Sequence, residues 1–538
     1  MTSRHRYVQG SAFAETNGFD EQLYHALRQS PWWMISLAVH VLLFVISGLM
    51  PTPAPIVTAP PMAHIEAREA VDAPDPEQPP GPDEIEALKP EDVRSVEPVV
   101  LDEPVLDEKV QSDNDLPSDQ PYGHTEGDRT GDFEGISNNT KIGLGGGWSK
   151  GGNGLGGHRN VGRKTRGSTA GQDAVEHALR WLATHQSPDG RWEAEGFGRW
   201  CDGKPSPEPV LDGAGRAPHD VGVTGLALLA FLGAGYSHRD GPFQATVLNG
   251  LRWLRNQQDP EGCVGARATG HHVYGHAIAA LALVEAYALT GSAMLKTPAQ
   301  KALDYIALTR NPYFAWRYGV KPGDNDTSVT GWMMMALKSA KLVNVADAAR
   351  SRPPTFQLDE EAFDGIRAWI DKMTDPETGR VGYQQRGTGP ARPNDLVDRF
   401  PAEKSEAMTA VGVLARVFLG ESPKASVAIQ NGAKLCTALP PVWKPAEGAV
   451  DMYYWYYATL AMFQVGGDPW KRWDAAMKPA IVDTQRMDGD YCRYKGSWDA
   501  VDPWGQDGGR VYATAVMAMC LEVYYRYERV AGLDAGGK

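Results

Sequence analysis

Three acidic side chains stand where apolar helical segments begin, and they are the first candidates for chemistry. Asp324 and Asp326 precede the apolar stretch 327–341, and Glu406 opens the stretch 406–420. A buried Asp can act as a general acid because the loss of solvation favours its protonated form. Two carboxylates that face each other across a cavity can instead cleave a glycosidic bond. The same residue types also cap helix N-termini, so the sequence leaves catalysis and capping open.

A second set of candidates is polar or aromatic and lies at or near the starts of the other apolar segments. Aromatic faces bind cations, sugars or apolar ligands, and a few polar groups fix the orientation of a ligand. The candidate ligand-binding residues are His272, His276, Trp332, Tyr454, Trp455, Arg510 and Tyr512, with His219, Asp220 and His271 at equivalent places. His272 and His276 have the spacing of a metal pair, but no HExxH glutamate accompanies them and no His follows His276. We therefore predict neither a metal nor another cofactor.

Two kinds of helix that alternate six times must position these residues. Amphipathic segments are expected at 174–186, 245–258, 298–310, 361–373, 427–439 and 472–485. More apolar segments follow them at 221–235, 273–291, 327–341, 406–420, 451–467 and 510–527. A helix that is apolar all round is buried, so the second kind lies inside the first. The pattern predicts an all-α fold over 172–530, an α6/α6 toroid of six outer/inner helix pairs.

The turn after the amphipathic segments carries a repeated motif. In the first unit an aromatic–aliphatic pair is followed by Gln186, Gly190 and Trp192, and in the second unit Gln258 and Gly262 recur at the same spacing. This arrangement resembles the repeat of the terpenoid cyclase and protein prenyltransferase superfamily, and more closely that of membrane-anchored bacterial squalene-cyclase-like proteins. The resemblance implies an α/α toroid over about 365 residues.

The same resemblance gives the acidic pair a specific meaning. Squalene–hopene-type cyclases protonate an alkene with the middle Asp of a DxDD motif, and Asp324-x-Asp326 opens an inner helix in the same way. The resemblance therefore implies Asp326 as the general acid, although Thr327 stands where the motif has its last Asp. The second toroid domain of those cyclases is also absent.

A segment near the start of the chain is long and apolar enough to cross a membrane. Residues 32–50 contain no Asp, Glu, Lys or Arg, and such a stretch spans a bilayer core of about 30 Å. The basic residues before it place residues 1–31 in the cytoplasm. We expect a single-pass protein of the inner membrane whose C-terminal domain lies in the periplasm.

Ser36 and His40 lie one helical turn apart within this span. A histidine in a membrane helix is costly and usually faces a protein partner or a proton path. The short lead, this pair and the Pro-rich stretch that follows resemble the anchor of the TonB family. The resemblance implies ExbB/ExbD-like proton-channel proteins as partners, and an inert anchor is the alternative.

The net charge of −14 belongs almost wholly to one segment. Residues 51–135 hold 22 acidic and five basic residues and are rich in proline, which predicts a disordered stalk. Residues 136–171 are glycine-rich and basic and are interpreted as a hinge. Residues 171–538 hold 42 acidic and 39 basic residues, a balance that argues against a nucleic-acid partner. The five Cys are too few and too scattered to predict a disulfide framework, and each is expected to be a small buried side chain.

These features favour a membrane-anchored periplasmic toroid that binds a ligand or a partner. Its ligand would be an apolar isoprenoid or a glycan. Two enzymatic alternatives remain open, an isomerase of the terpenoid-cyclase type with Asp326 as acid, and a carbohydrate-active enzyme that uses Asp326 and Glu406.

Overall fold

Amphipathic helices form the outer layer of the folded domain, as the sequence pattern predicts. The computed structural model of the chain describes residues 169–210, 212–267 and 271–523. In α11, the apolar positions recur every three or four residues and are buried, whereas the opposite side of the helix is exposed. The outer helices are α5 (Thr169–Thr184), α7 (Gln244–Asn256), α9 (Ala293–Thr309), α11 (Glu361–Met373), α13 (Val427–Ala438) and α15 (Gly467–Val482).

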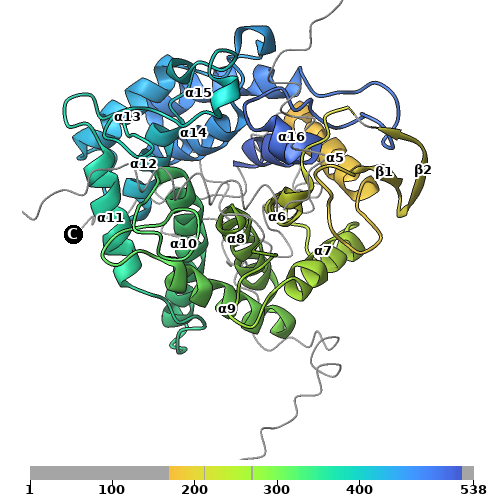
Figure 1. Ribbon diagram of the computed structural model, residues 1–538, viewed down its shortest axis with the longest axis horizontal. Helices are drawn as coiled ribbons and strands as arrows, with labels where there is room; N and C mark the ends of the chain where they lie inside the picture. The colour runs from red at the N-terminus through yellow and green to blue at the C-terminus, as the bar shows by residue number, and fades with distance from the viewer. Residues whose placement is uncertain (1–168, 211, 268–270, 524–538) are drawn as a thin grey trace, which may run out of the picture. The chain divides into compact units, whose positions relative to one another are not determined.

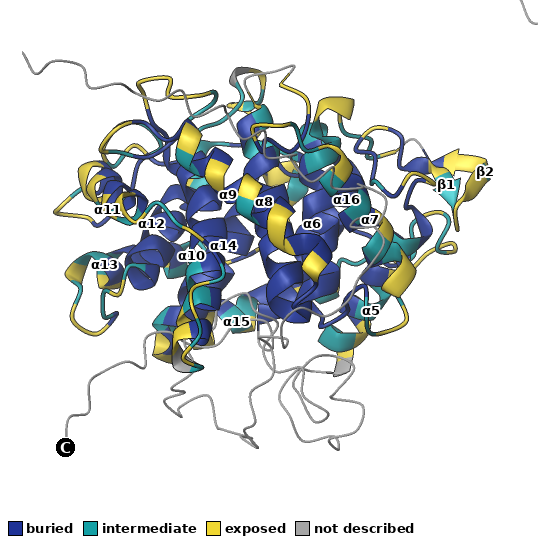
Figure 2. Ribbon diagram, turned by 90° about the horizontal axis from the view of Figure 1, so that it is seen from below, coloured by how far each residue is buried: buried dark blue, intermediate teal, exposed yellow. Residues whose placement is uncertain are grey.

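The inner helices are buried nearly all round. They are α6 (Asp220–Gly233), α8 (His272–Thr290), α10 (Thr327–Ala349), α12 (Ala407–Phe418), α14 (Met452–Val465) and α16 (Gly505–Leu521). Each inner helix packs against the next one in the chain, and α16 packs back against α6, which closes the ring (Figure 1). Buried residues concentrate on these six helices, and exposed residues lie on the outer helices and the loops (Figure 2). The described residues therefore form the predicted α6/α6 toroid.

The repeated turn ties each outer helix to the next one. The Gln186 amide donates to Gly190 O (2.7 Å) and to Thr246 O on α7 (2.9 Å). Gly190 has φ +100°, and a Cβ there would meet the backbone of α7 at 2.4 Å, so only glycine fits. The Trp192 indole turns back and donates to Leu182 O on α5 (2.7 Å). The motif is thus a structural joint between neighbouring units.

The sixth turn differs from the sequence expectation. Gln485 bonds to Gly496 O, not to the turn at Gly489, and it also donates to Ala174 O on α5, both at 2.8 Å. Gln485 and Gly496 are therefore seven positions further apart than Gln186 and Gly190. For this reason the spacing of the motif cannot be recognised in the sixth unit. The turn of the last unit is therefore hydrogen-bonded to α5, the first helix of the ring.

A disulfide reinforces the seam between the first and sixth units. Cys201 is bonded to Cys492 across 291 residues of sequence, with their Cα atoms 5.2 Å apart. The expectation that every Cys is a lone buried side chain was therefore wrong for these two, while Cys263, Cys436 and Cys520 are free and buried. Sequence spacing could not reveal the pairing because only ring closure brings the two ends together.

Local departures from the expected helices are small. A two-stranded hairpin, β1 (Gly198–Cys201) and β2 (Lys204–Val210), is inserted between α5 and α6 and was not predicted. Four short 3-10 helices lie in loops at Ala217–His219, Asn394–Leu396, Ala402–Lys404 and Pro445–Glu447. Within α16, Gly509 (φ +65°) makes a kink before the regular helix begins.

One helix among the described residues is long and apolar enough to cross a membrane. Among them, α8 has the length and mean hydropathy (1.4) of a membrane span, but 89% of its apolar stretch is buried inside the ring. Burial of this kind is expected of a core helix. The predicted lead, the span at 32–50, the stalk and nearly all of the hinge lie outside the described residues.

Candidate functional site

A cavity of about 420 Å³ lies where the inner helices begin. Its walls come from the N-terminal parts of all six inner helices, from the loops that precede them, and from the end of the outer helix α7. Eight aromatic side chains line it: Trp253, Tyr274, Tyr318, Trp332, Tyr383, Tyr453, Trp504 and Tyr512. All six inner helices therefore begin at the same side of the ring and contribute to one cavity.

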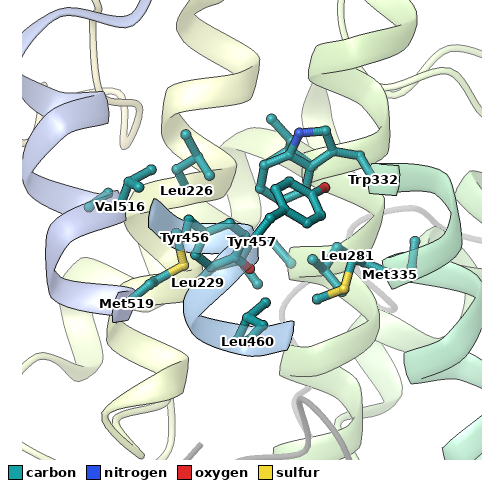
Figure 3. Packing of buried hydrophobic residues seen from close by; sticks show 14 of the residues in the cluster. Leu226, Leu229, Leu281, Trp332, Met335, Tyr456, Tyr457, Leu460, Val516 and Met519 are labelled. Atoms are coloured by element: carbon teal, nitrogen blue, oxygen red, sulfur yellow. The ribbon is translucent and has the colours of Figure 1, made fainter. Parts of the chain in front are cut away.

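The centre of the ring beyond this mouth is filled. Tyr456, Tyr457 and Leu460 from α14 meet Leu281 and apolar side chains of the other inner helices there (Figure 3). Tyr456 is 1% exposed and Tyr457 is 0% exposed. The cavity is therefore a pocket at one end of the toroid.

A chain of hydroxyl groups runs along one side of the cavity. The Trp332 indole donates to Tyr274 Oη (2.9 Å), which bonds to Ser328 Oγ (3.1 Å), which bonds to Tyr453 Oη (3.1 Å). Burial raises the pKa of the Tyr274 and Tyr453 hydroxyls above the usual range, so both stay protonated. These groups can exchange hydrogen bonds with a ligand that carries hydroxyls of its own.

An ionisable cluster from the starts of α6 and α16 also lines the cavity. Asp507 Oδ1 is 3.0 Å from Arg216 Nη1 and 3.8 Å from His219 Nε2. Burial lowers the pKa of His219, and the charge of Asp507 opposes this shift. The His271 ring packs in a tilted arrangement against the Tyr318 ring, with 4.4 Å between their centroids. The cluster therefore presents imidazoles and a paired carboxylate to the cavity.

Asp220 is the second carboxylate on the cavity wall. Its Oδ1 accepts the Ala194 N–H (2.9 Å), and its Oδ2 is 3.6 Å from Arg191 Nε. Burial raises the pKa of Asp220 to about 6, although Ala194 and Arg191 favour the charged form. Its environment is thus suited to holding a proton near neutral pH.

Three of the seven predicted ligand-binding residues line the cavity, namely His272, Trp332 and Tyr512, and the residues at equivalent places, His219, Asp220 and His271, line it as well. His272 Nε2 shares a hydrogen bond with Tyr305 Oη (3.1 Å). The Tyr512 hydroxyl donates to Asp502 Oδ2 at 2.9 Å. Burial raises the pKa of Asp502 to about 7, with the nearby Asp451 acting in the same direction.

The predicted catalytic acids do not line the cavity. Asp326 is fully buried and caps α10 through the Val329 N–H (2.7 Å). Burial raises its pKa to about 7, and Val329 and Arg317 partly offset the shift. Asp324 is half-exposed and pairs with Arg317.

Glu406 forms a buried ion pair with Arg380. It is 3% exposed, its Oε1 is 2.5 Å from Arg380 Nη2, and its Oε2 accepts the Thr409 hydroxyl (2.6 Å). These contacts place Glu406 at the joint between α11 and α12. The structure thus supports capping and pairing for Asp326 and Glu406, and brings neither of them to the cavity.

His276 holds the turn that precedes its helix, a role that a threonine has in other units. Both of its ring nitrogens are engaged, Nδ1 with the Val264 N–H (3.0 Å) and Nε2 with Ala302 O (3.1 Å). In four other units a Thr hydroxyl of the inner helix accepts the corresponding N–H: Thr224, Thr330, Thr409 and Thr514. Burial lowers the pKa of His276 to about 4, so it stays neutral as a core group.

The other predicted ligand-binding residues also face away from the cavity. Tyr454 donates to Cys436 O and Leu439 O of the neighbouring outer unit, and Trp455 packs against Trp443. Arg510 is fully buried at the seam, where it pairs with Asp212 (3.1 Å) and Asp499 (2.7 Å). An inner helix has two sides, and the sequence could not indicate which of them these residues occupy.

Within the described residues, the one group with the proximity of a metal site is Cys201, Asp202 and Cys492, whose sulfurs form the disulfide. Ser36 and His40 lie outside the described residues.

Sequence reasoning missed Asp507 and the loop aromatics Tyr318, Tyr383 and Trp504, which line the cavity. The kink at Gly509 separates Asp507 from the regular part of α16, so helix periodicity gave no signal for it.

Comparisons with known proteins find only distant similarity to solved structures. No family model matches the chain, and no curated protein matches it. An alpha-1,6-mannanase from Salegentibacter sp. is 10% identical over 66% of this chain and 99% of its own, with a TM-score of 0.43. A cellobiose 2-epimerase from Bacillus thermoamylovorans is 14% identical over 66% of this chain and 98% of its own, with a TM-score of 0.45. At this level of similarity neither a substrate nor an activity transfers to this chain.

Proposed function

We propose that the toroid binds a carbohydrate in the cavity at the mouth of the inner helices. The observation that carries the proposal is the combination of eight aromatic side chains with a chain of hydroxyls and an ionisable rim around one cavity. A sugar ring presents C–H faces that pack on aromatic rings and hydroxyls that need hydrogen-bond partners. The cavity volume, about 420 Å³, falls within the range of small-molecule sites.

The cyclase alternative has less support. A terpene is a hydrocarbon and could form no hydrogen bond with the hydroxyls, imidazoles and carboxylates that line this cavity. Its protonation would need Asp326 within reach of the substrate, and Asp326 does not line the cavity. Aromatic faces could also stabilise a carbocation, so an isoprenoid remains the competing ligand in the test.

The test measures binding of soluble oligosaccharides to the full-length chain by calorimetry, with a farnesyl compound as competitor. We expect an oligosaccharide to bind and the Tyr318→Ala variant to weaken binding about tenfold, or about 1.4 kcal/mol. Tyr313→Ala is the matched control, because Tyr313 is 84% exposed and does not line the cavity. Binding of the farnesyl compound in preference to every oligosaccharide would contradict the proposal.

We further propose that the toroid works in the periplasm, held there by the anchor and stalk expected at residues 1–135. The Cys201–Cys492 disulfide supports an oxidising compartment. Coupling to ExbB/ExbD-like proteins through Ser36 and His40 stays a prediction. Co-purification with such proteins that survives His40→Ala unchanged would remove it.

A further inference from the structure

We propose that Asp220 and Asp507 hydrolyse a glycosidic bond of the carbohydrate, an inference that rests on the binding function proposed above. Asp220 and Asp507 are the two carboxylates among the described residues that line the cavity. They belong to α6 and α16, which pack side by side where the ring closes (Figure 1). His219 precedes Asp220 in the chain, and its Nε2 lies 3.8 Å from Asp507 Oδ1, so the chain segments that carry the two carboxylates adjoin.

The loops that carry the two carboxylates are fixed to each other. The Arg216 N–H donates to Asp507 O (2.8 Å), and its guanidinium pairs with the Asp507 side chain at 3.0 Å. Gly215 N donates to Ala194 O (2.8 Å), and the Ala194 N–H holds Asp220 Oδ1 at 2.9 Å. These contacts hold both carboxylates in defined positions, as catalysis by an oriented pair requires.

The two environments differ as a general acid and a general base require. The Asp220 side chain is 17% exposed, and burial raises its pKa to about 6. The Asp507 side chain is 28% exposed, pairs with the Arg216 guanidinium at 3.0 Å and lies 3.8 Å from His219 Nε2. We therefore assign the acid role to Asp220, the more buried of the two carboxyl groups, and the base role to Asp507, the more exposed one.

The reaction balances with water as the only co-reactant. Asp220 donates its proton to the glycosidic oxygen as the bond from C1 to that oxygen breaks, and the electron pair leaves with the oxygen. A water molecule attacks C1 and transfers a proton to Asp507. Aromatic faces of the cavity, including Tyr512 and Trp504, lie where they can stabilise positive charge that develops on the sugar ring.

The first experiment uses the full-length chain and a set of cello-, malto-, xylo- and manno-oligosaccharides. Calorimetry identifies those that bind, and release of reducing ends measures cleavage. We expect Asp220→Asn and Asp507→Asn to lower cleavage at least about 100-fold and to change the dissociation constant less than about threefold. Asp324→Asn is the matched control, because Asp324 is half-exposed and does not line the cavity.

The second experiment separates a catalytic role from loss of folding. In an Asp507→Ala variant, azide can enter the space of the missing carboxylate and attack C1 in place of activated water. We expect azide to restore cleavage with a glycosyl azide as product, and to leave the Asp220→Asn variant inactive. A wild-type chain that binds oligosaccharides and cleaves none overturns this inference but leaves the proposed function intact. A chain that binds none overturns both.

Discussion

Carboxylates at the starts of the inner helices fall into two groups that differ by region. In the third to fifth units, Asp326, Glu406 and Asp451 are at most 3% exposed, and each is held by a helix N–H, a hydroxyl or an arginine. In the first and sixth units, Asp220 and Asp507 reach the cavity and have side chains 17% and 28% exposed. The same residue type at the same kind of place therefore serves stability in one region and is available for chemistry in the other.

Removal of Asp451 should have the largest effect on stability. Its Oδ2 pairs with Arg392 at 2.7 Å with both side chains 3% exposed, and its Oδ1 caps α14 through the Tyr454 N–H (3.0 Å). Asp451→Ala leaves a buried guanidinium without this partner, which costs about 3–5 kcal/mol. Denaturant unfolding measures it.

The matched control for that experiment is Asp507→Ala on the cavity side. Because Asp507 is partly exposed and its arginine is mostly solvated, its loss should cost less than about 1 kcal/mol. Equal losses for the two variants would show that the two groups of carboxylates do not differ in the way we describe.

His276→Ala is expected to cost about 1–3 kcal/mol, because the Val264 N–H and Ala302 O lose their buried partner. His276→Thr should recover part of this loss, since threonine accepts the corresponding N–H in four other units. Thermal unfolding of both variants checks it. A threonine variant as unstable as the alanine variant would argue against the structural equivalence.

The difference between the two groups of carboxylates also shows which features of the fold and the site could be predicted from the sequence. The alternation of amphipathic and apolar segments was enough to predict the toroid, because burial follows from periodicity alone. The starts of the inner helices correctly indicated the cavity, and His272, Trp332 and Tyr512 line it. Periodicity did not distinguish the side of an inner helix that faces the cavity from the side that faces an outer helix, so Tyr454 and Arg510 were assigned to the wrong environment.

Asp326 should give stability a pH dependence of predictable sign. Its pKa is about 7 in the folded chain, because of burial, and about 3.9 in an unfolded one. The folded state binds more protons between these values, so the free energy of unfolding falls as pH rises from about 4 to 7. Asp326→Asn removes this contribution, and its stability relative to the wild type should rise over that range by at most about 1.4 kcal/mol per pH unit.

Unfolding of wild type and Asp326→Asn at a series of pH values measures this difference directly. Asp502→Asn should behave in the same way, because burial also raises the pKa of Asp502 to about 7. A difference between variant and wild type that is constant from pH 4 to 7 would contradict a buried, protonatable Asp326.

The smallest expected effect on stability is that of replacing Trp504. This substitution tests a residue that lines the cavity, and it leaves every charged group in place. The Trp504 indole nitrogen has no hydrogen-bond partner among the described residues, whereas the Trp332 nitrogen donates to Tyr274 at 2.9 Å. Trp504→Phe should therefore change stability by less than about 0.5 kcal/mol, and Trp332→Phe should cost about 1 kcal/mol.

Binding should be sensitive to the same change. If the Trp504 N–H donates to a sugar hydroxyl, Trp504→Phe loses one hydrogen bond, and oligosaccharide binding weakens about fivefold, or about 1 kcal/mol. Calorimetry on the full-length variant measures it. An unchanged dissociation constant together with an unchanged stability would mean that the ligand leaves this donor unused, and would move the binding site toward the Trp332 and Tyr274 side of the cavity.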